Sequence, residues 1–328
     1  MDKIIKEGVS LMPKKIDVVY TWVDHKNEAW QKEKNQHIKK KSAANNTARF
    51  DSSLNELKYS LRSLDLYFSE CIHKIYLVTN HGSIPDFIDQ SRADLVIING
   101  NELLKGISFC SCTFESVLHE IPNLTENFLY FNDDMLLTAP LSLKDLFDTT
   151  GKPIWYQESD KLLRFISSNS YLINPFNLDG QVSKARENTF QQLDLNKKMP
   201  PPIGHSPRIL NKTYVKKFIG LYPEAIDHLR NILFRSEDTF CFLDAYCYYF
   251  SHHKMLNFVK EKKTLILIQS DYFSRITNKL RIFLAVDFSF ICVADLRNKN
   301  KQPCPEVSKY LEKTFPKPAR WESTNRKI

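Results

Sequence analysis

The sequence predicts an α/β protein with a parallel, Rossmann-like core and a more helical C-terminal half. Three observations predict this fold. Short apolar runs typical of buried strands recur in the first 134 residues, an amphipathic helical stripe lies between the first two runs, and the 328 residues are 42% hydrophobic. A chain of this length and composition can bury a large core, and its 26% of charged residues is typical of a globular protein.

Four β-rich runs each end in polar residues, and they cover residues 16–22, 74–80, 94–99 and 127–134. Three of these runs are almost continuously apolar, as expected of strands that are buried on both faces of a parallel sheet. Between the first two runs, leucines and a phenylalanine step by three and four residues, which predicts one buried face of a helix; these are Leu54, Leu57, Leu61, Leu64 and Phe68. Strand, helix and strand in this order indicate a crossover unit.

Further along the chain, local signals predict the remaining elements. The polar stretch 26–46 is interpreted as a long loop or a frayed helix, and residues 114–121 as a helix. Ser142 and Asp145 have the spacing of a capping box. Helices are expected over 223–233, starting at a proline, and over 236–250, with Ser236 as the candidate cap. We expect an α/β core over 1–150 and a helical portion with a basic tail over 151–328.

Charge and cysteine usage restrict the partners and the compartment. The chain carries 46 basic and 38 acidic residues, a net charge of +8, which favours an anionic partner. Residues 297–328 contain nine Lys or Arg but only three acids, a pattern compatible with contact at the inner face of the cell membrane or with a solvated surface. No nucleic-acid-binding signature is present. Seven cysteines without a C-x-x-C pair indicate a reducing, cytoplasmic environment, and Cys110 and Cys112 are interpreted as packing residues.

The polar ends of the apolar runs are the first candidates for a binding site. The eight glycines never form a phosphate-binding glycine motif, so any phosphate must be held by side chains and metal. In an open parallel sheet, ligands bind beyond the carboxyl ends of the strands, where Thr21, Trp22 and Asn80 are expected. Asp133 and Asp134 follow the fourth run, and their oxygens suit Mg²⁺ or Mn²⁺. Both can face one ion only if the chain turns there; the alternative is a pair of solvated acids at a strand end.

Three segments outside these runs supply further candidates. His205 lies between a proline-rich loop and Pro207, where it is either a general base or an ordinary loop histidine. Arg235 and Asp238 flank the expected start of a helix, where they could bind phosphate and orient a catalytic group, or simply favour the helix start. Arg62 lies on the amphipathic helix and is either a site residue or a solvent-facing cation.

Several sequence blocks resemble the Stealth family. The blocks are IDVVYTWVD at 16–24, NELKYSLRSLDLY at 55–67, KIYLVTN at 74–80 and FESVLHEIPNLTENFLYFNDDM at 114–135. HSP at 205–207, FRSEDTF at 234–240 and FPKPARWE at 315–322 are similar to later blocks of that family. The resemblance runs in order from about residue 14 to 322. At 109–115 this chain reads FCSCTFE, where many relatives read FNSHAIE, so a histidine at that place is not required here.

The resemblance implies a GT-A-like, nucleotide-sugar-binding core and a capsular polysaccharide phosphotransferase. Such an enzyme transfers a hexose- or N-acetylhexosamine-1-phosphate from a UDP-sugar to a hydroxyl of a capsular oligosaccharide, forms a phosphodiester and releases UMP. Carried over by motif, the donor side comprises Tyr20, Thr21, Trp22, Arg62 and Asn80, and the metal site comprises Asp133 and Asp134. The catalytic residues are Asp17, His205, Arg235 and Asp238.

Two other functions fit the same residues. A metal-dependent glycosyltransferase would use the same donor but release UDP, because it cleaves at the anomeric carbon. A catalytically silent glycan-binding or scaffold protein within a biosynthetic complex is the third interpretation. The identity of the nucleotide product distinguishes the first two, and the absence of turnover would indicate the third.

Overall fold

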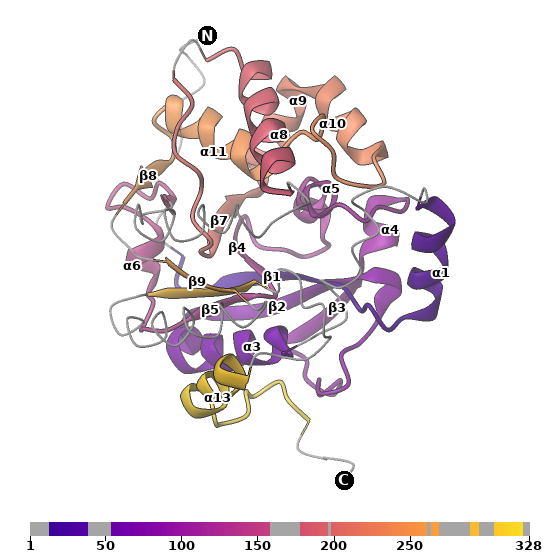
Figure 1. The fold of residues 1–328 in the computed structure, drawn as a ribbon. Coiled ribbons are helices and arrows are strands. Elements are labelled where there is room, and N and C mark those ends of the chain that lie inside the picture. The colour runs from indigo at the N-terminus through magenta and orange to yellow at the C-terminus, as the bar shows by residue number, and fades with distance from the viewer. Residues whose placement is uncertain are drawn as a thin grey trace.

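A five-stranded sheet lies at the centre of the molecule (Figure 1). The computed structural model describes residues 13–38, 54–157, 178–195, 198–260, 264–268, 289–294 and 305–323. The strand order is β3-β2-β1-β4-β7, with β3 at Leu95–Asn99, β2 at Ile72–Thr79, β1 at Ile16–Trp22, β4 at Asn127–Asn132 and β7 at Arg208–Asn211. The first four strands are parallel, and β7 is antiparallel to β4. The predicted parallel α/β core and its four strands are therefore confirmed.

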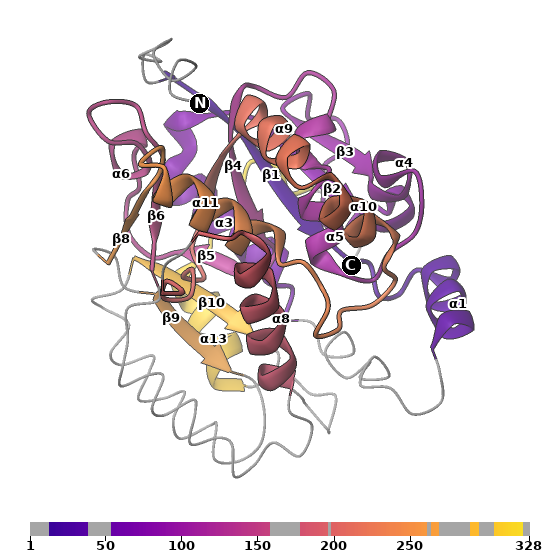
Figure 2. The ribbon, with the colours of Figure 1, turned by 90° about the horizontal axis from the view of Figure 1, so that it is seen from above.

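Both faces of this sheet are buried, which explains why its strands are almost continuously apolar. Val18 and Tyr20 of β1 pack in the core cluster that contains residues of helix α3 (Glu56–Phe68). Val19 packs in a second cluster, on the opposite face of the sheet. Helix α13 (Pro305–Thr314) lies on the α3 side. On the opposite side lie α5 (Ser111–Glu115), α9 (Lys212–Leu221), α10 (Pro223–Asn231) and α11 (Phe242–His252) (Figures 1 and 2).

Two smaller β-structures flank the central sheet. β5 (Met135–Leu137) pairs antiparallel with β10 (Phe290–Ala294), which is parallel to β9 (Thr264–Ile268). β6 (Ile154–Tyr156) pairs with β8 (Asn257–Val259). The C-terminal half thus adds strands as well as helices: β7 extends the central sheet, and β10 pairs with a strand from the first 150 residues. The division at residue 150 stays a prediction.

The predicted helix signals mostly mark real helix ends. The capping box forms at the start of α6 (Leu143–Leu146): the Asp145 carboxylate accepts the Ser142 N–H at 2.9 Å, and the Ser142 side chain accepts the Asp145 backbone N–H. Pro223 is the first residue of α10. The polar stretch after β1 contains α1 (Glu28–His37), and the part from residue 39 onward lies outside the described residues. Between β3 and β4, α4 (Gly100–Leu104) precedes α5, and a short 3-10 turn replaces the rest of the helix expected at 114–121.

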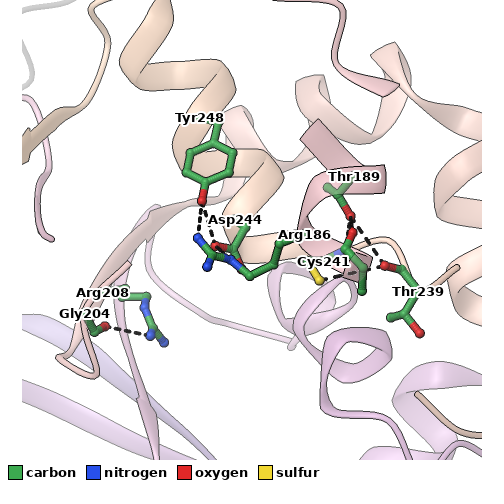
Figure 3. Close-up of polar contacts among 9 residues, drawn as sticks. Arg186, Thr189, Gly204, Arg208, Thr239, Cys241, Asp244 and Tyr248 are labelled. Atoms are coloured by element: carbon green, nitrogen blue, oxygen red, sulfur yellow. Dashed lines mark hydrogen bonds and ion pairs between the residues drawn. The ribbon is translucent and has the colours of Figure 1, made fainter. Parts of the chain in front are cut away.

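The prediction that Ser236 caps the following helix is wrong. The Thr239 hydroxyl accepts the Ser236 N–H at 2.8 Å, and the Ser236 carbonyl accepts the Thr239 N–H at 3.2 Å, so these residues close a turn of their own. Helix α11 begins later, with Cys241 as its cap residue. The Cys241 N–H donates to the Thr189 hydroxyl of α8 (Leu178–Gln192) at 2.9 Å, which fixes the place where α11 starts (Figure 3). None of the described helices combines the length and the apolarity needed to cross a membrane.

Candidate functional site

The carboxyl ends of β1, β2 and β4 meet at one edge of the central sheet. The register pairs Trp22 of β1 with Thr79 of β2, and Thr21 of β1 with Asn132 of β4. Residues that directly follow these strands therefore lie at the same edge, which we call the carboxyl edge. Figures 1 and 2 show α1 and α4, which follow β1 and β3, at this end of the sheet. The predicted convergence of the strand ends is confirmed.

Asn80, which follows β2, fastens the end of that strand to the chain that leaves β1. Its side-chain oxygen accepts the Asp24 N–H at 2.6 Å, and its side-chain nitrogen donates to the Asp24 carbonyl at 3.2 Å. The side chain is buried, with 6% of the residue exposed. The pair of bonds fixes the chain where it leaves β1, so Asn80 determines the shape of the carboxyl edge.

Asp133 and Asp134 lie in the turn between β4 and β5, so the turn that a shared ion requires is present. One Asp134 oxygen accepts the Cys292 thiol at 3.4 Å, and the Asp134 carbonyl accepts the Val293 N–H at 2.8 Å. The second Asp134 oxygen and the Asn132 side-chain oxygen are both buried, and within the described part of the chain neither has a hydrogen-bond partner.

These two oxygens fit a divalent cation. A buried acceptor without a donor is costly, and a hard cation satisfies carboxylate and amide oxygens together. Within the described residues no three His, Cys, Asp or Glu side chains gather in ligating geometry. An ion at this turn would therefore complete its shell with Asn132, water or substrate phosphate, which is usual for Mg²⁺.

A buried carboxyl lies next to this edge on the helical side. Glu115, the last residue of α5, is 8% exposed. Burial, followed by the nearby Cys112 thiol, raises its pKa well above the usual value, and the Arg235 and Arg208 guanidinium groups act in the opposite direction. The Glu115 charge also acts on Tyr130. The Tyr130 hydroxyl lies 3.0 Å from the Thr21 hydroxyl at the carboxyl end of β1. Sequence reasoning missed Glu115, although a lone acid in a largely apolar stretch was the available signal.

Arg235, in the loop between α10 and α11, contacts α5, the helix that carries Glu115. One guanidinium nitrogen donates to the Ser111 hydroxyl at 2.7 Å and lies 3.5 Å from the Cys112 sulfur. The Phe234 ring stacks on Phe109, with centroids 5.0 Å apart, and the Phe109 N–H donates to the Leu233 carbonyl at 2.7 Å. The segment around Phe109 thus holds the Arg235 loop in place. Asp238, three residues later, is exposed, and its N–H donates to the Ser236 hydroxyl at 3.2 Å.

His205 is exposed in the short segment that leads into β7. Tyr130 of β4 pairs antiparallel with Arg208, so the residues just before Arg208 lie beside the carboxyl end of β4. Gly204 fixes this segment: its N–H donates to the Tyr156 carbonyl at 2.8 Å, and its carbonyl accepts the Arg208 guanidinium at 2.9 Å (Figure 3). A Cβ at Gly204 would lie 3.1 Å from the Tyr156 carbonyl oxygen, so glycine permits this close approach.

An ion pair joins α8 to α11 on the helical side of the sheet. The Arg186 guanidinium donates to the Asp244 carboxylate at 2.8 Å and to the Tyr248 hydroxyl (Figure 3). The Asp244 charge contributes to the raised pKa of Glu115. Asp244 thus affects the pKa of Glu115 although its own charge is paired with Arg186.

Three predicted site residues lie elsewhere and have structural roles. Asp17 is fully buried at the amino end of β1, where it accepts from the Thr125 N–H and contacts His73, each at 2.8 Å. At about 3.3 Å per residue, it lies roughly 16 Å from the carboxyl end of its strand. We therefore correct its catalytic assignment to a structural one.

Tyr20 and Arg62 need the same correction. Tyr20 is fully buried on the α3 face, with its hydroxyl 2.9 Å from that of Ser60, because alternate strand residues point to opposite faces. Arg62 binds Glu322 through two nitrogens, at 2.6 and 2.8 Å, and donates to the Phe315 carbonyl at 2.9 Å. Its guanidinium is engaged on the face opposite to α5 and α11. Trp22, the half-buried last residue of β1, stays at the carboxyl edge.

The central part of the chain matches a described protein family. Residues 49–155 match the Stealth protein CR2, conserved region 2. This region contains β2, β3, α5 and the Asp133–Asp134 turn. The chain belongs to the Stealth family. The family resemblance expected from the sequence blocks is thereby confirmed.

Curated relatives in the Stealth family extend the likeness beyond this region. The chain is 31% identical over 236 residues to the capsular polysaccharide phosphotransferase fcs1 of Haemophilus influenzae, covering 69% of this chain and 62% of the relative. It is 27% identical over 325 residues to the capsular polysaccharide phosphotransferase SacB of Neisseria meningitidis serogroup A, covering 94% of this chain and 57% of the relative. The chain thus spans about three fifths of the length of these relatives.

A solved structure of another protein has a similar fold. The WbbM bifunctional glycosyltransferase superposes with a TM-score of 0.51 at 8% identity, over 94% of this chain and 51% of that protein. The likeness supports the GT-A-like fold expected for this chain, in which helices pack on both faces of a mostly parallel sheet.

Proposed function

We propose that this Stealth protein is a capsular or exopolysaccharide phosphotransferase. It would transfer a hexose- or N-acetylhexosamine-1-phosphate from a UDP-sugar to a hydroxyl of a capsular oligosaccharide, with release of UMP. The observation that carries the proposal is the pair of buried oxygens on Asn132 and Asp134, unpartnered within the described residues. The charge effect of Arg235 on Glu115 and the pairing of β7 with β4 support the same site. The names of the curated relatives support the same reaction class.

The donor would bind across the carboxyl edge. Asp133 and Asp134, with Asn132, would hold Mg²⁺ or Mn²⁺, and such an ion neutralises the diphosphate charge when it is bound. Thr21 and Trp22, at the end of β1, would contact the nucleotide, and Asn80 would keep the adjoining loop in shape for it. The Arg235 guanidinium would bind the phosphate oxygens, because a planar, bidentate cation fits them well.

The acceptor would be activated from the β7 side. His205 would take the proton from the attacking hydroxyl, which then displaces UMP in line at phosphorus. Glu115 would hold the guanidinium groups of Arg235 and Arg208 in position through its charge, and Asp238 would orient the Arg235 loop. Stabilising the charge that develops on the transferred phosphate is the main task of such a site.

The positive net charge of the chain favours binding to an anionic surface. With a net charge of +8, we propose that it works at the inner face of the cell membrane or within a capsule-assembly complex. A metal-dependent glycosyltransferase is the second candidate, because WbbM shares the fold.

The nucleotide product tests the proposal. The full chain is incubated with Mg²⁺, UDP-sugars and short capsule oligosaccharides, and the nucleotides and glycans are separated and weighed by mass spectrometry. We expect UMP together with a glycan that has gained a sugar phosphate. UDP together with a glycan that has gained only the sugar would establish the glycosyltransferase instead.

A further inference from the structure

Trp30 is the buried aromatic residue of α1, the helix that follows β1. Only 6% of this residue is exposed, although most residues of the helix are polar or charged. The Lys34 ammonium nitrogen, one helical turn further on, lies 4.8 Å from the centre of the Trp30 ring. The contacts of this ring therefore indicate what α1 does in the molecule.

Helix α1 is fixed to the carboxyl edge of the sheet by polar contacts. Asn27 caps the helix, because its side-chain oxygen accepts the Trp30 N–H at 3.0 Å. The Asn27 side-chain nitrogen donates to the Ser83 hydroxyl at 2.8 Å, and the Glu33 carboxylate contacts the His81 ring at 3.0 Å. Ser83 and His81 both follow β2, so α1 is held at the end of that strand.

Three aromatic rings connect α1 to the Arg235 loop. The Trp30 and Phe109 rings have centroids 5.8 Å apart and planes at 69°, an edge-to-face arrangement that is favourable for aromatic pairs. Phe109 in turn stacks on Phe234, with centroids 5.0 Å apart and planes at 17°. Phe234 directly precedes Arg235 in the chain. The three rings, which we call the aromatic row, thus reach from the helix after β1 to the residue beside Arg235.

The backbone around Phe109 holds the same loop. The Ser108 hydroxyl donates to the Ile232 carbonyl at 2.9 Å, and the Phe109 N–H donates to the Leu233 carbonyl at 2.7 Å. Arg235 is exposed, so the position of its guanidinium depends on the loop that carries it. A displacement of Phe109 would therefore move this loop at two points, the ring contact and the backbone hydrogen bond.

We propose that Trp30 is a positioning residue for Arg235. Through the aromatic row it holds the loop in the place where the guanidinium meets the phosphate of the donor. This role in the reaction rests on the proposed function, whereas the support of the loop by Trp30 does not. A misplacement of about 1 Å can lower turnover about 10²-fold even when the substituted residue is far from the reacting atoms. Loss of the Trp30 ring should therefore reduce turnover although the ring does not touch substrate.

Amide hydrogen exchange of the full chain tests whether Trp30 supports this loop. Trp30→Ala is compared with the wild type and with Lys32→Ala, a matched substitution at an exposed position of the same helix. We expect the hydrogen-bonded amides of Phe109 and Ser236 to exchange at least about tenfold faster in Trp30→Ala and at the wild-type rate in Lys32→Ala. Faster exchange confined to α1 would overturn the proposal. If Trp30→Ala does not fold, Trp30→Leu, which keeps an apolar side chain without the ring, takes its place.

Kinetics of sugar-phosphate transfer separate positioning from a general loss of structure. Trp30→Ala should lower kcat about tenfold, and Trp30→Phe, which keeps a ring, should restore most of this loss. In an Arg235→Ala background Trp30→Ala should have no further effect on kcat, because the group that it positions is already absent. Equal losses in the two backgrounds would overturn the positioning role. Faster exchange of the loop in a chain that transfers no sugar phosphate would support the contact made by Trp30 and reject the proposed function.

Discussion

Charged groups on the α3 side of the central sheet and those at its carboxyl edge differ in how completely they are satisfied. On the α3 side, Arg62 donates to both oxygens of Glu322 and to the Phe315 carbonyl, and Glu322 also accepts the Ala319 N–H at 2.8 Å. At the carboxyl edge, the buried oxygens of Asn132 and Asp134 have no partner within the described residues. Both regions are built around buried charge or polarity, but among the described residues only the α3 side satisfies its buried groups.

This difference separates stabilising charges from charges that are held for a ligand. A buried ion pair in which each guanidinium nitrogen has a partner fastens two segments, here α3 and the residues after α13. Buried acceptors without donors cost stability, and such groups are retained where a ligand satisfies them. The predictions below break or sharpen this comparison, from the largest expected effect to the smallest.

The largest effect is expected from the Asp133–Asp134 turn. Asp134→Asn keeps the size of the side chain but removes the charge that would hold the cation, so turnover should fall on the order of 10³-fold. Sugar-phosphate transfer is measured together with the free energy of unfolding. The exposed Asp86→Asn is the matched control and should leave both unchanged. An active Asp134→Asn enzyme would place the metal elsewhere.

Removal of metal should have a similar effect without any substitution. Dialysis against EDTA should abolish transfer by the wild-type chain, and added Mg²⁺ or Mn²⁺ should restore it, because both ions prefer oxygen ligands. The rate of UMP formation is followed during both steps. Full turnover by a preparation shown to be metal-free would contradict the metal assignment.

Glu115 should contribute less, because we expect it to act through the two guanidinium groups near it. Glu115→Gln should lower kcat about 10²-fold, with a smaller change in KM, since loss of orientation affects the transition state more than donor binding. Steady-state kinetics with varied UDP-sugar measure the two constants. Glu120→Gln, on the same stretch of chain but half-exposed, is the control. A change confined to KM would remove Glu115 from the catalytic group.

The smallest effect concerns stability against acid. Burial, followed by the charge of Arg230, lowers the pKa of His119 to about 4. The unfolded chain takes up this proton near pH 6.5, so His119 contributes stability above that pH and loses it as the pH falls toward 4. The loss amounts to about 3 kcal/mol at most. Urea unfolding at pH 7 and 4.5 should show a steeper decline for wild type than for His119→Gln, and parallel declines would contradict this assignment.

The sequence predicted those parts of the fold that depend on neighbours in the chain. Apolar runs, the stripe on α3 and the capping box at Ser142 are local patterns, and all of them appear in the structure. Strand ends could be placed at one edge because parallel order follows from a crossover unit. The turn at Asp133–Asp134 was stated as a condition for metal binding, and the structure contains it.

The errors arose where long-range contacts or strand geometry decide. Arg62 finds Glu322 260 residues away, so no local pattern could show that its charge is used for structure. Asp17 and Tyr20 belong to the same motif as Thr21, but one lies at the wrong end of β1 and the other points to the wrong face.

Two arginines that the sequence assigned to one site allow the most direct test of this comparison. Arg62→Ala and Arg235→Ala are compared for unfolding free energy and for turnover at a temperature where both are folded. We predict that Arg62→Ala loses about 3–5 kcal/mol of stability and keeps its turnover, because the buried Glu322 loses the guanidinium that binds both of its oxygens. Arg235→Ala should lose at least roughly 100-fold in turnover with little change in stability. The reverse pattern, a stable but inactive Arg62 variant and an active Arg235 variant, would contradict the account.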